Sequence, residues 1–291
     1  MDLSDPPSWS KTKMNKLGKA LLSGDNAPAG CPTYDEVMLW HHELAAEVAR
    51  IIRETAWSTR DPALRNLQIR VSSRGKTVDT LVQKLERSRI GLEAIQDLAG
   101  VRVDGDFTLT QQTAIANAMT KEFSVDERGK RDLRANPRSG YRAYHLWMRC
   151  PAGRVEIQIR TEAQSEWANT YERLGDLLGR GIRYDELPHD AGPRSLVLQL
   201  HGVASVLAKV EEGIDGSRRA TPISDGQVSK VSRKARSRAA RARVRRMARE
   251  RRRRQDTDAM RTAKASIFTI HQAYIVELKN LRRMIEALEV G

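Results

Sequence analysis

The stretch Val155-Glu156-Ile157-Gln158-Ile159-Arg160-Thr161 decides how the chain folds. Apolar and polar residues alternate through it, which is the pattern of a β-strand with one face against a core. The other face carries Glu156, Gln158 and Arg160, and three aligned polar side chains on such a strand need a wet cleft or a shared ligand. An exposed sheet face is the alternative, and this stretch alone leaves both open.

The residues on either side of this strand alternate between strand and helix patterns. Strand patterns recur at 67–71, 98–103 and 144–149, whereas apolar residues recur at helical spacing over 34–57, 77–87, 108–123 and 162–178. Strands that alternate with helices in this way predict a mixed sheet with helices packed on its faces. The expected fold class is therefore α/β, or α+β, with about five strands.

Changes of composition divide the chain into three regions. Residues 1–32 are polar and rich in Pro and Gly, which predicts a flexible segment, and residues 33–180 hold all the strand patterns. Residues 181–291 lack strand patterns and predict a helical extension. Its last part carries an apolar stripe from Ile267 to Leu288, which suits packing on a domain or pairing with a partner helix, so an oligomer through these helices is permitted.

Nearly all of the excess charge lies in one segment of this extension. The formal net charge is +14, and residues 230–254 hold 14 Lys and Arg against Glu250 alone. A segment of this kind binds nucleic-acid backbones without sequence preference, and it would also suit a ribosome or an acidic protein partner. A solvated tail is the alternative.

The remaining composition excludes several classes of protein. No apolar run is long enough to cross a bilayer, and the polar start Met1–Ser10 is unlike a signal peptide, so a cytoplasmic protein without a membrane partner is expected. Cys31 and Cys150 are too few for a disulfide framework. Neither a nucleophile elbow nor a complete phosphate-binding P-loop occurs.

Two clusters upstream of the central strand suit phosphate chemistry. Arg74, Lys76 and Lys84 surround the start of a helix after a strand, where cations and free backbone N–H groups favour a polyphosphate. Asp97 stands at the edge of the next strand, where a carboxylate can hold a magnesium ion. A solvated helix end and a turn-forming aspartate are the alternatives.

The segment from Arg128 to His145 is rich in cations and contains Tyr141. A cationic loop with an aromatic residue suits the phosphates and the base of a nucleotide. An ordinary basic hairpin is the alternative.

In their order, these clusters resemble the synthetase domain of the RelA/SpoT homologue family over roughly residues 66–176. The matching motifs are Arg74-x-Lys76-x-x-x-Thr80-x-x-x-Lys84, then Asp97-Leu-Ala-Gly-Val-Arg102, then Asp132 with Pro137 and Gly140-Tyr141-Arg142-x-x-His145, then Glu156-Ile-Gln-Ile-Arg-Thr161. The combination is far more specific than any single motif. The segment from Trp167 to Asp176 looks more like the toxic small alarmone synthetases than the housekeeping enzymes.

The resemblance implies a nucleotidyltransferase-like fold and an ATP pyrophosphokinase, which moves the β,γ-diphosphate of ATP to the 3′-hydroxyl of a second nucleotide. It implies Asp97 as a Mg²⁺ ligand and Glu156 as a second acidic group, which supports the metal or takes the proton of the attacking hydroxyl. The residues implied for ATP binding are Arg74, Lys76, Thr80, Lys84, Arg102, Gln158 and Arg160, and those for the acceptor are Lys130, Arg131, Arg138, Tyr141, Arg142 and His145.

Three functions are consistent with these residues. The favoured one is a growth-inhibiting toxin that pyrophosphorylates the 3′-CCA end of tRNA. The Arg-rich segment suits a polyanionic acceptor, and the resemblance implies this acceptor because members of the toxic branch can pyrophosphorylate the tRNA 3′-CCA end. Some members of that branch are neutralised by an antitoxin protein. The second is a (p)ppGpp synthetase that uses GDP or GTP. The third is a non-catalytic nucleic-acid-binding protein, against which the intact Asp97, Glu156 and Tyr141 speak.

Overall fold

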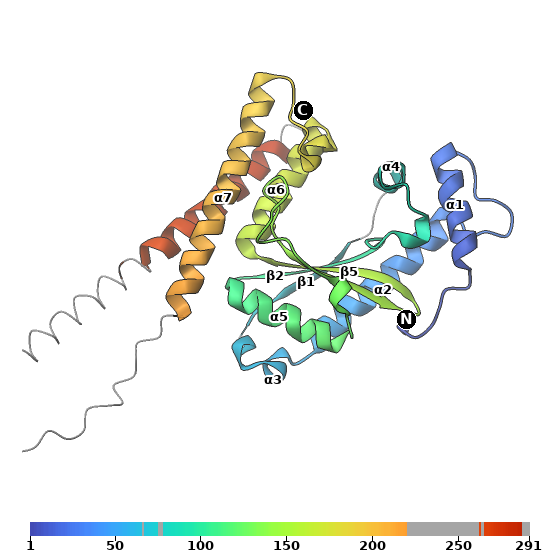
Figure 1. The fold of residues 1–291 in the computed structure, drawn as a ribbon, viewed down its shortest axis with the longest axis horizontal. Helices are drawn as coiled ribbons and strands as arrows, with labels where there is room; N and C mark the ends of the chain where they lie inside the picture. The colour runs from blue at the N-terminus through green and yellow to red at the C-terminus, as the bar shows by residue number, and fades with distance from the viewer. Residues whose placement is uncertain (66, 75–77, 220–261, 263–264, 287–291) are drawn as a thin grey trace, which may run out of the picture.

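A mixed sheet of five strands, in the order β1-β2-β5-β4-β3, forms the centre of the molecule (Figure 1). The strands are β1 (Arg70–Arg74), β2 (Ala99–Gly105), β3 (Lys130–Asp132), β4 (Tyr144–Cys150) and β5 (Gly153–Thr161). Strands β2 and β5 are parallel and the other neighbours are antiparallel. This computed structural model describes residues 1–65, 67–74, 78–219, 262 and 265–286. The predicted mixed sheet with flanking helices is confirmed.

One face of the sheet is apolar and carries the main core. Helices α2 (Tyr34–Glu54) and α5 (Leu109–Glu122) cover it, and α5 lies below the sheet in Figure 1. Val101, Ile157 and Leu146, from three neighbouring strands, are fully buried there. The alternation in Val155–Thr161 therefore places Glu156, Gln158 and Arg160 on the opposite face, which α4 (Val78–Ser88) and α6 (Glu162–Leu178) flank.

Local sequence fixes where three helices begin. Thr33, Thr108 and Thr161 each accept a hydrogen bond from a backbone N–H in the first turn, and a Glu or Gln three residues later bonds back to the cap. Such capping boxes satisfy backbone N–H groups that a helix start otherwise leaves without partners. Helix α6 consequently has the predicted bounds. Short helical turns complete the domain: α3 (Trp57–Arg60), η1 (Pro62–Leu64), η2 (Leu92–Ala94), η3 (Glu127–Gly129) and η4 (Arg180–Tyr184).

The N-terminal region differs from the prediction of a flexible segment over residues 1–32. It contains helix α1 (Lys11–Ser23), which begins at the Ser10 cap and ends at Gly24 in a left-handed conformation. Leu17 is 1% exposed and packs with Leu81 and Leu85 of α4. Apolar residues at helical spacing lie between the lysines of α1, and tertiary packing on α4 stabilises this short helix.

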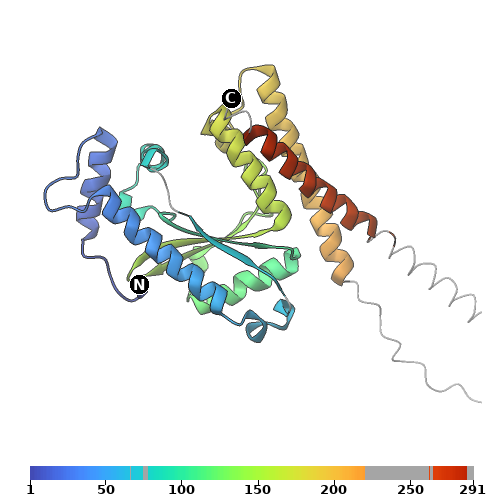
Figure 2. The same cartoon turned by 180° about the vertical axis from the view of Figure 1, so that it is seen from behind.

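The C-terminal extension packs on the domain itself. Helix α7 (Ala191–Arg219) and the helix over residues 265–286 lie beside α6 (Figures 1 and 2). Ile275, Leu278 and Ile285 are 2–3% exposed in this contact, and Lys279 Nζ lies 3.1 Å from Glu162 Oε1. Of the two uses predicted for the apolar stripe, packing on the domain is the one observed. The Arg-rich segment 230–254 and Lys76 lie outside the described residues, and no described helix is long and apolar enough to span a membrane.

Candidate active site

Strand register brings the polar residues of distant segments into rows on one face of the sheet. Glu156 lies between Gly100 of β2 and Trp147 of β4. Gln158 lies between Arg102 and His145 in the same manner. Paired residues of neighbouring strands stand on the same side of the sheet. The polar face of β5 therefore lies in a site that several segments build together.

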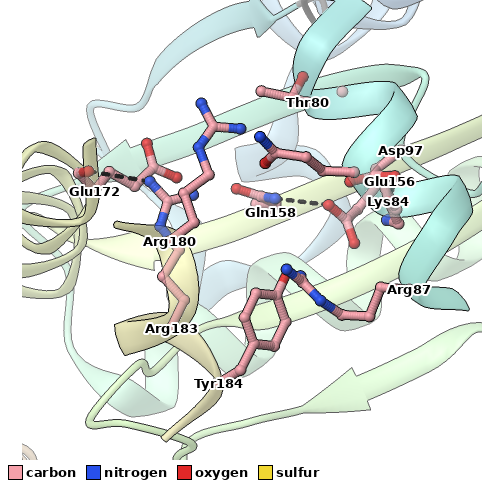
Figure 3. A pocket seen from close by; sticks show the side chains of 12 residues that line it. Thr80, Lys84, Arg87, Asp97, Glu156, Gln158, Glu172, Arg180, Arg183 and Tyr184 are labelled. Atoms are coloured by element: carbon pink, nitrogen blue, oxygen red, sulfur yellow. Dashed lines mark hydrogen bonds and ion pairs between the residues drawn. The ribbon is translucent and has the colours of Figure 1, made fainter. Parts of the chain in front are cut away.

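A pocket opens over this polar face (Figure 3). Helix α4 forms one wall, the start of β2 and the middle of β5 form the floor, and α6 with η4 forms the opposite wall. The lining side chains are mainly charged. They belong to Thr80, Gln83, Lys84, Arg87, Asp97, Glu156, Gln158, Glu172, Arg180, Arg183 and Tyr184, with Gly100 in the floor. Of the two possibilities that the alternation in β5 left open, the structure shows a polar cleft rather than an exposed sheet face.

Two carboxylates and a lysine meet on the floor of the pocket. Lys84 Nζ lies 2.5 Å from Asp97 Oδ1, and both side chains are partly exposed to the pocket. Glu156, the second carboxylate, is 8% exposed. Carboxylate oxygens are the ligands that magnesium prefers, and it completes its shell with phosphates and water. Among the described residues, no group of three or more His, Cys, Asp or Glu could hold a metal ion. The donor set at this position is two carboxylates, which leaves the remaining ligands of such an ion to phosphate and water.

Glu156 and four neighbouring side chains form a closed cycle of hydrogen bonds. The Tyr141 hydroxyl pairs with His145 Nε2 at 2.8 Å, and His145 Nδ1 lies 3.2 Å from Glu156 Oε1. Gln158 donates to Glu156 at 2.6 Å, and Arg160 donates to Gln158 at 2.6 Å and to Tyr141 at 2.7 Å. Each side chain is fixed by two neighbours, so the cycle is preorganised before any substrate binds.

The charges in this cycle shift the protonation of its members. Burial would lower the pKa of His145, but Tyr141 and Glu156 outweigh it and raise this pKa to about 9. Burial would raise the pKa of Glu156, but His145 and the hydrogen bond from Gln158 hold it far below its usual value. At neutral pH the pair is therefore imidazolium and carboxylate, and Glu156 stays ionised although it is buried.

The residues predicted to bind ATP are only partly placed together. Thr80, Lys84 and Gln158 line the pocket, and Arg160 belongs to the cycle beside it. Arg102 is partly buried next to it and donates to Glu172 Oε2 at 2.9 Å. Arg74 stands opposite Gly100 in the register of β1 and β2. Lys76, as stated above, lies outside the described residues.

Three of the cations predicted to bind the acceptor lie at two places, on strand β3 and in the loop that follows it. Arg131 stacks over the Trp147 ring at 4.4 Å and lies in the same row as His145, whereas Lys130 pairs with Glu127. Arg138 lies near the pocket mouth, where its Nε is 3.1 Å from Asp185. Lys130 and Arg131 thus lie on the edge strand β3, whereas Arg138 lies in the loop between β3 and β4.

Arg142 is in a different environment from the one predicted. It is 5% exposed and forms an ion pair with Glu211 of α7, which is equally buried. Glu211 also accepts hydrogen bonds from Thr161 and Gln164. The Arg142 guanidinium thus joins the sheet to α7, and its burial leaves no surface for an acceptor nucleotide.

Several pocket residues were missed by the sequence analysis. Thr80, Lys84 and Arg87 stand at positions i, i+4 and i+7 of one helix, which places them on the same face. This spacing could have identified Arg87 as a pocket residue. Arg180, Arg183 and Tyr184 lie on η4, which begins at the predicted domain boundary after residue 180 and continues beyond it. A 3-10 turn of five residues has no period that could have revealed which side chains face the pocket.

Comparison with known proteins agrees with this fold. Residues 73–173 match the family described as the region found in RelA / SpoT proteins. An uncharacterised protein of Mycobacterium tuberculosis is 47% identical over 208 residues, which is 71% of this chain and 74% of that protein. The GTP pyrophosphokinase YjbM of Bacillus subtilis is 35% identical over 120 residues, 36% of this chain and 54% of YjbM. The crystal structure of small alarmone synthetase 2 from Bacillus subtilis superposes with a TM-score of 0.50 at 22% identity, over 64% of this chain and 98% of that one.

The mixed sheet and its charged cleft, together with these relatives, define a diphosphotransferase. Such enzymes need little covalent chemistry from the protein and depend on positioning and charge neutralisation, which carboxylates and cations around one pocket supply. The chain belongs to the RelA/SpoT homologue family, and its fold is that of a small alarmone synthetase.

Proposed function

We propose that this enzyme transfers the β,γ-diphosphate of ATP to the 3′-hydroxyl at the CCA end of tRNA, and that it acts as a growth-inhibiting toxin in the cytoplasm. The observation that carries the diphosphate transfer is the meeting of Asp97 and Glu156 with cations of two opposite walls in one pocket. In the reaction, the 3′-oxygen bonds to the β-phosphorus while the bond from that phosphorus to the α,β-bridging oxygen breaks; AMP leaves, and the proton of the 3′-hydroxyl passes to water.

The electrostatics support a particular role for Glu156. Trp147, Gln158 and His145 all approach its carboxylate, and the lowered pKa keeps it charged. An efficient general base has a pKa near the operating pH. Glu156 therefore suits the support of cationic charge better than the removal of the proton from the acceptor hydroxyl.

Asp97 and Glu156 are the residues that would hold Mg²⁺. The ion, when bound, neutralises the charge of the polyphosphate. Lys84 pairs with Asp97 and lines the pocket from the α4 wall, where its ammonium group would face the phosphates. The chain's own part is to hold these groups in place, and the ion pair with Lys84 orients the Asp97 carboxylate.

The preference for tRNA rests on the sequence of residues 230–254, because 14 cations against one acidic residue suit a polyanion much larger than a mononucleotide. An antitoxin that neutralises the enzyme through an acidic surface is part of this proposal. The second candidate acceptor is GDP or GTP, which the similarity to the GTP pyrophosphokinase YjbM supports. A non-catalytic nucleic-acid-binding protein is the third candidate, and the preorganised site argues against it.

The test is an incubation with ATP labelled at the γ-phosphate, Mg²⁺, and either deacylated tRNA, GDP or GTP. Label in tRNA supports the proposal, label in the small nucleotide supports the second candidate, and label in neither overturns the enzymatic function. Asp97→Ala should abolish transfer. Glu43→Ala, an exposed carboxylate of α2 on the other side of the sheet, is the matched control and should transfer normally.

A further inference from the structure

Turn η4 forms a wall of the pocket, although no motif assigns a function to it. Arg180, Arg183 and Tyr184 all line the pocket from this turn, across from Arg87 on α4 (Figure 3). Two of these three residues add positive charge to a cleft that already holds Lys84. The turn therefore contributes as many cations to the pocket as α4 does.

The turn is fixed from behind by buried contacts. Ile182, in its middle, is 3% exposed, and its carbonyl accepts a hydrogen bond of 2.8 Å from the Tyr171 hydroxyl of α6. His201 of α7 pairs with the same hydroxyl at 2.7 Å. Arg183 donates to the carbonyl of Glu172 at 3.1 Å. With its apolar side anchored on two helices, η4 presents its other side chains to the pocket at defined positions.

The Tyr184 ring joins cations from the two sides of the pocket. The guanidinium of Arg87, on α4, lies 3.6 Å from the ring centroid, and that of Arg138, in the loop before β4, lies 5.6 Å from it. Both distances lie within the reach of a cation–π interaction. Long arginine side chains at a surface otherwise sample many rotamers, so the ring restricts the positions of both guanidinium groups.

A second contact joins the same loop to the end of η4. Asp185 accepts a hydrogen bond of 2.6 Å from Ser139 and one of 3.1 Å from Arg138. Ser139 and Asp185 have φ values of 49° and 67°, the left-handed region that costs energy for residues other than glycine. Such conformations persist where the surroundings impose them, and they concentrate at ligand clamps. The loop and η4 therefore hold each other in place at the pocket mouth.

We propose that Tyr184 is a positioning residue, which holds Arg87 ready for the phosphates of ATP and Arg138 ready for the acceptor. Arg87 lies one turn after Lys84, on the donor side, and Arg138 precedes the Tyr141 cycle, on the acceptor side. One aromatic ring thus aligns a cation for each of the two substrates. This inference rests on the proposed function, because it assigns the two cations to the two substrates of that reaction.

The ring of Tyr184, rather than its hydroxyl, is the part that matters. Within the described residues its hydroxyl makes no hydrogen bond, whereas its ring contacts Arg87 and Arg138. Tyr184→Phe keeps the ring and should behave as the wild type, while Tyr184→Leu keeps an apolar side chain and removes the π face. Tyr184 is 38% exposed, so neither change creates a buried cavity.

The experiment measures KM and kcat for ATP and for the acceptor that the wild type uses. Tyr184→Leu should raise each KM about two- to fivefold, the change that an exposed cation–π contact corresponds to, with a smaller effect on kcat. Combining it with Arg87→Ala should add little to the KM for ATP beyond Arg87→Ala alone, because the ring acts through that arginine. Leu39→Ala and Arg50→Ala, at exposed positions of α2, are matched controls.

The outcomes separate this inference from the proposed function. A wild type that transfers label while Tyr184→Leu keeps both KM values overturns the positioning role and leaves the function standing. Equal losses for Tyr184→Phe and Tyr184→Leu overturn it as well, because the hydroxyl would then be responsible. Full additivity of Tyr184→Leu and Arg87→Ala contradicts the part of the inference that concerns ATP.

Discussion

Removing the Glu211 carboxylate should destabilise the protein strongly. Glu211 and Arg142 are each 5% exposed and form an ion pair, and Glu211 also accepts from Thr161 and from Gln164 at 3.3 Å. Glu211→Ala leaves the Arg142 charge buried without its partner, which costs about 3–5 kcal/mol. The free energy of unfolding should fall by that amount.

The assay is urea unfolding followed by intrinsic tryptophan fluorescence. With a slope of about 3 kcal/mol per M urea, the midpoint should fall by roughly 1–2 M. Glu212→Ala, the exposed neighbour on α7, should stay within about 0.5 kcal/mol of the wild type. The double change Arg142→Met with Glu211→Leu should recover most of the loss, since an apolar pair of similar volume often replaces a buried ion pair without cost.

Equal midpoints for Glu211→Ala and Glu212→Ala would refute this reasoning. A second refutation concerns function: if Arg142→Met with Glu211→Leu is as stable as the wild type but has lost acceptor binding, Arg142 binds the acceptor after all. A stable and active double variant would instead confirm that this arginine serves the packing of α7 on the sheet.

Three further predictions concern other parts of the fold. The native pKa of His145 lies at about 9, above the ordinary value of 6.5, so the native state holds an extra proton between these pH values. The free energy of unfolding should therefore fall as pH rises from 6.5 through 9. In a His145→Gln protein measured at the same pH values, this free energy should fall less. Gly140 has a φ of 85°, and a Cβ added there would lie only 2.8 Å from the tryptophan of α6, so Gly140→Ala should lower the free energy of unfolding in urea by about 1–3 kcal/mol. Gly202→Ala on α7, where nothing lies within 4 Å of the new Cβ, should raise it by about 0.5–1 kcal/mol. Equal effects of the two changes would contradict the strain at Gly140. Leu17→Ala should cost about 2–5 kcal/mol and weaken ATP binding measured by calorimetry, because α1 supports α4, while Leu22→Ala, 43% exposed, should change neither.

The sequence predicted the sheet and most helices because their signals are local. Helix α6 has the predicted bounds, since the Thr161 capping box and the amphipathic spacing both lie within the segment. Strand β3 was not predicted, because three residues are too few to display an alternation. Helix α1 was taken for a flexible segment, because its lysines hide the few apolar residues that pack on α4.

The candidate site was predicted only in part, because only some of its residues are revealed by local patterns in the sequence. Glu156, Gln158 and Arg160 were assigned to one face correctly, because side chains of a strand alternate whatever surrounds it. Arg142 was assigned to the acceptor site because it belongs to the cationic segment and to the motif Gly140-Tyr141-Arg142-x-x-His145 that the resemblance covers. Its partner Glu211 lies 69 residues further along the chain, and no local pattern reveals that pairing.

The sequence by itself thus determined which residues share a face of a strand or helix, because short-range backbone geometry sets that periodicity. Only the tertiary structure decided which faces meet. The register of β2, β5 and β4 closes the cycle around Glu156, the burial of Glu211 takes Arg142 out of the site, and the anchoring of η4 on α6 brings Tyr184 to Arg87. These contacts join segments far apart in the chain, and they depend on the packing of whole elements rather than on the preference of any one of them.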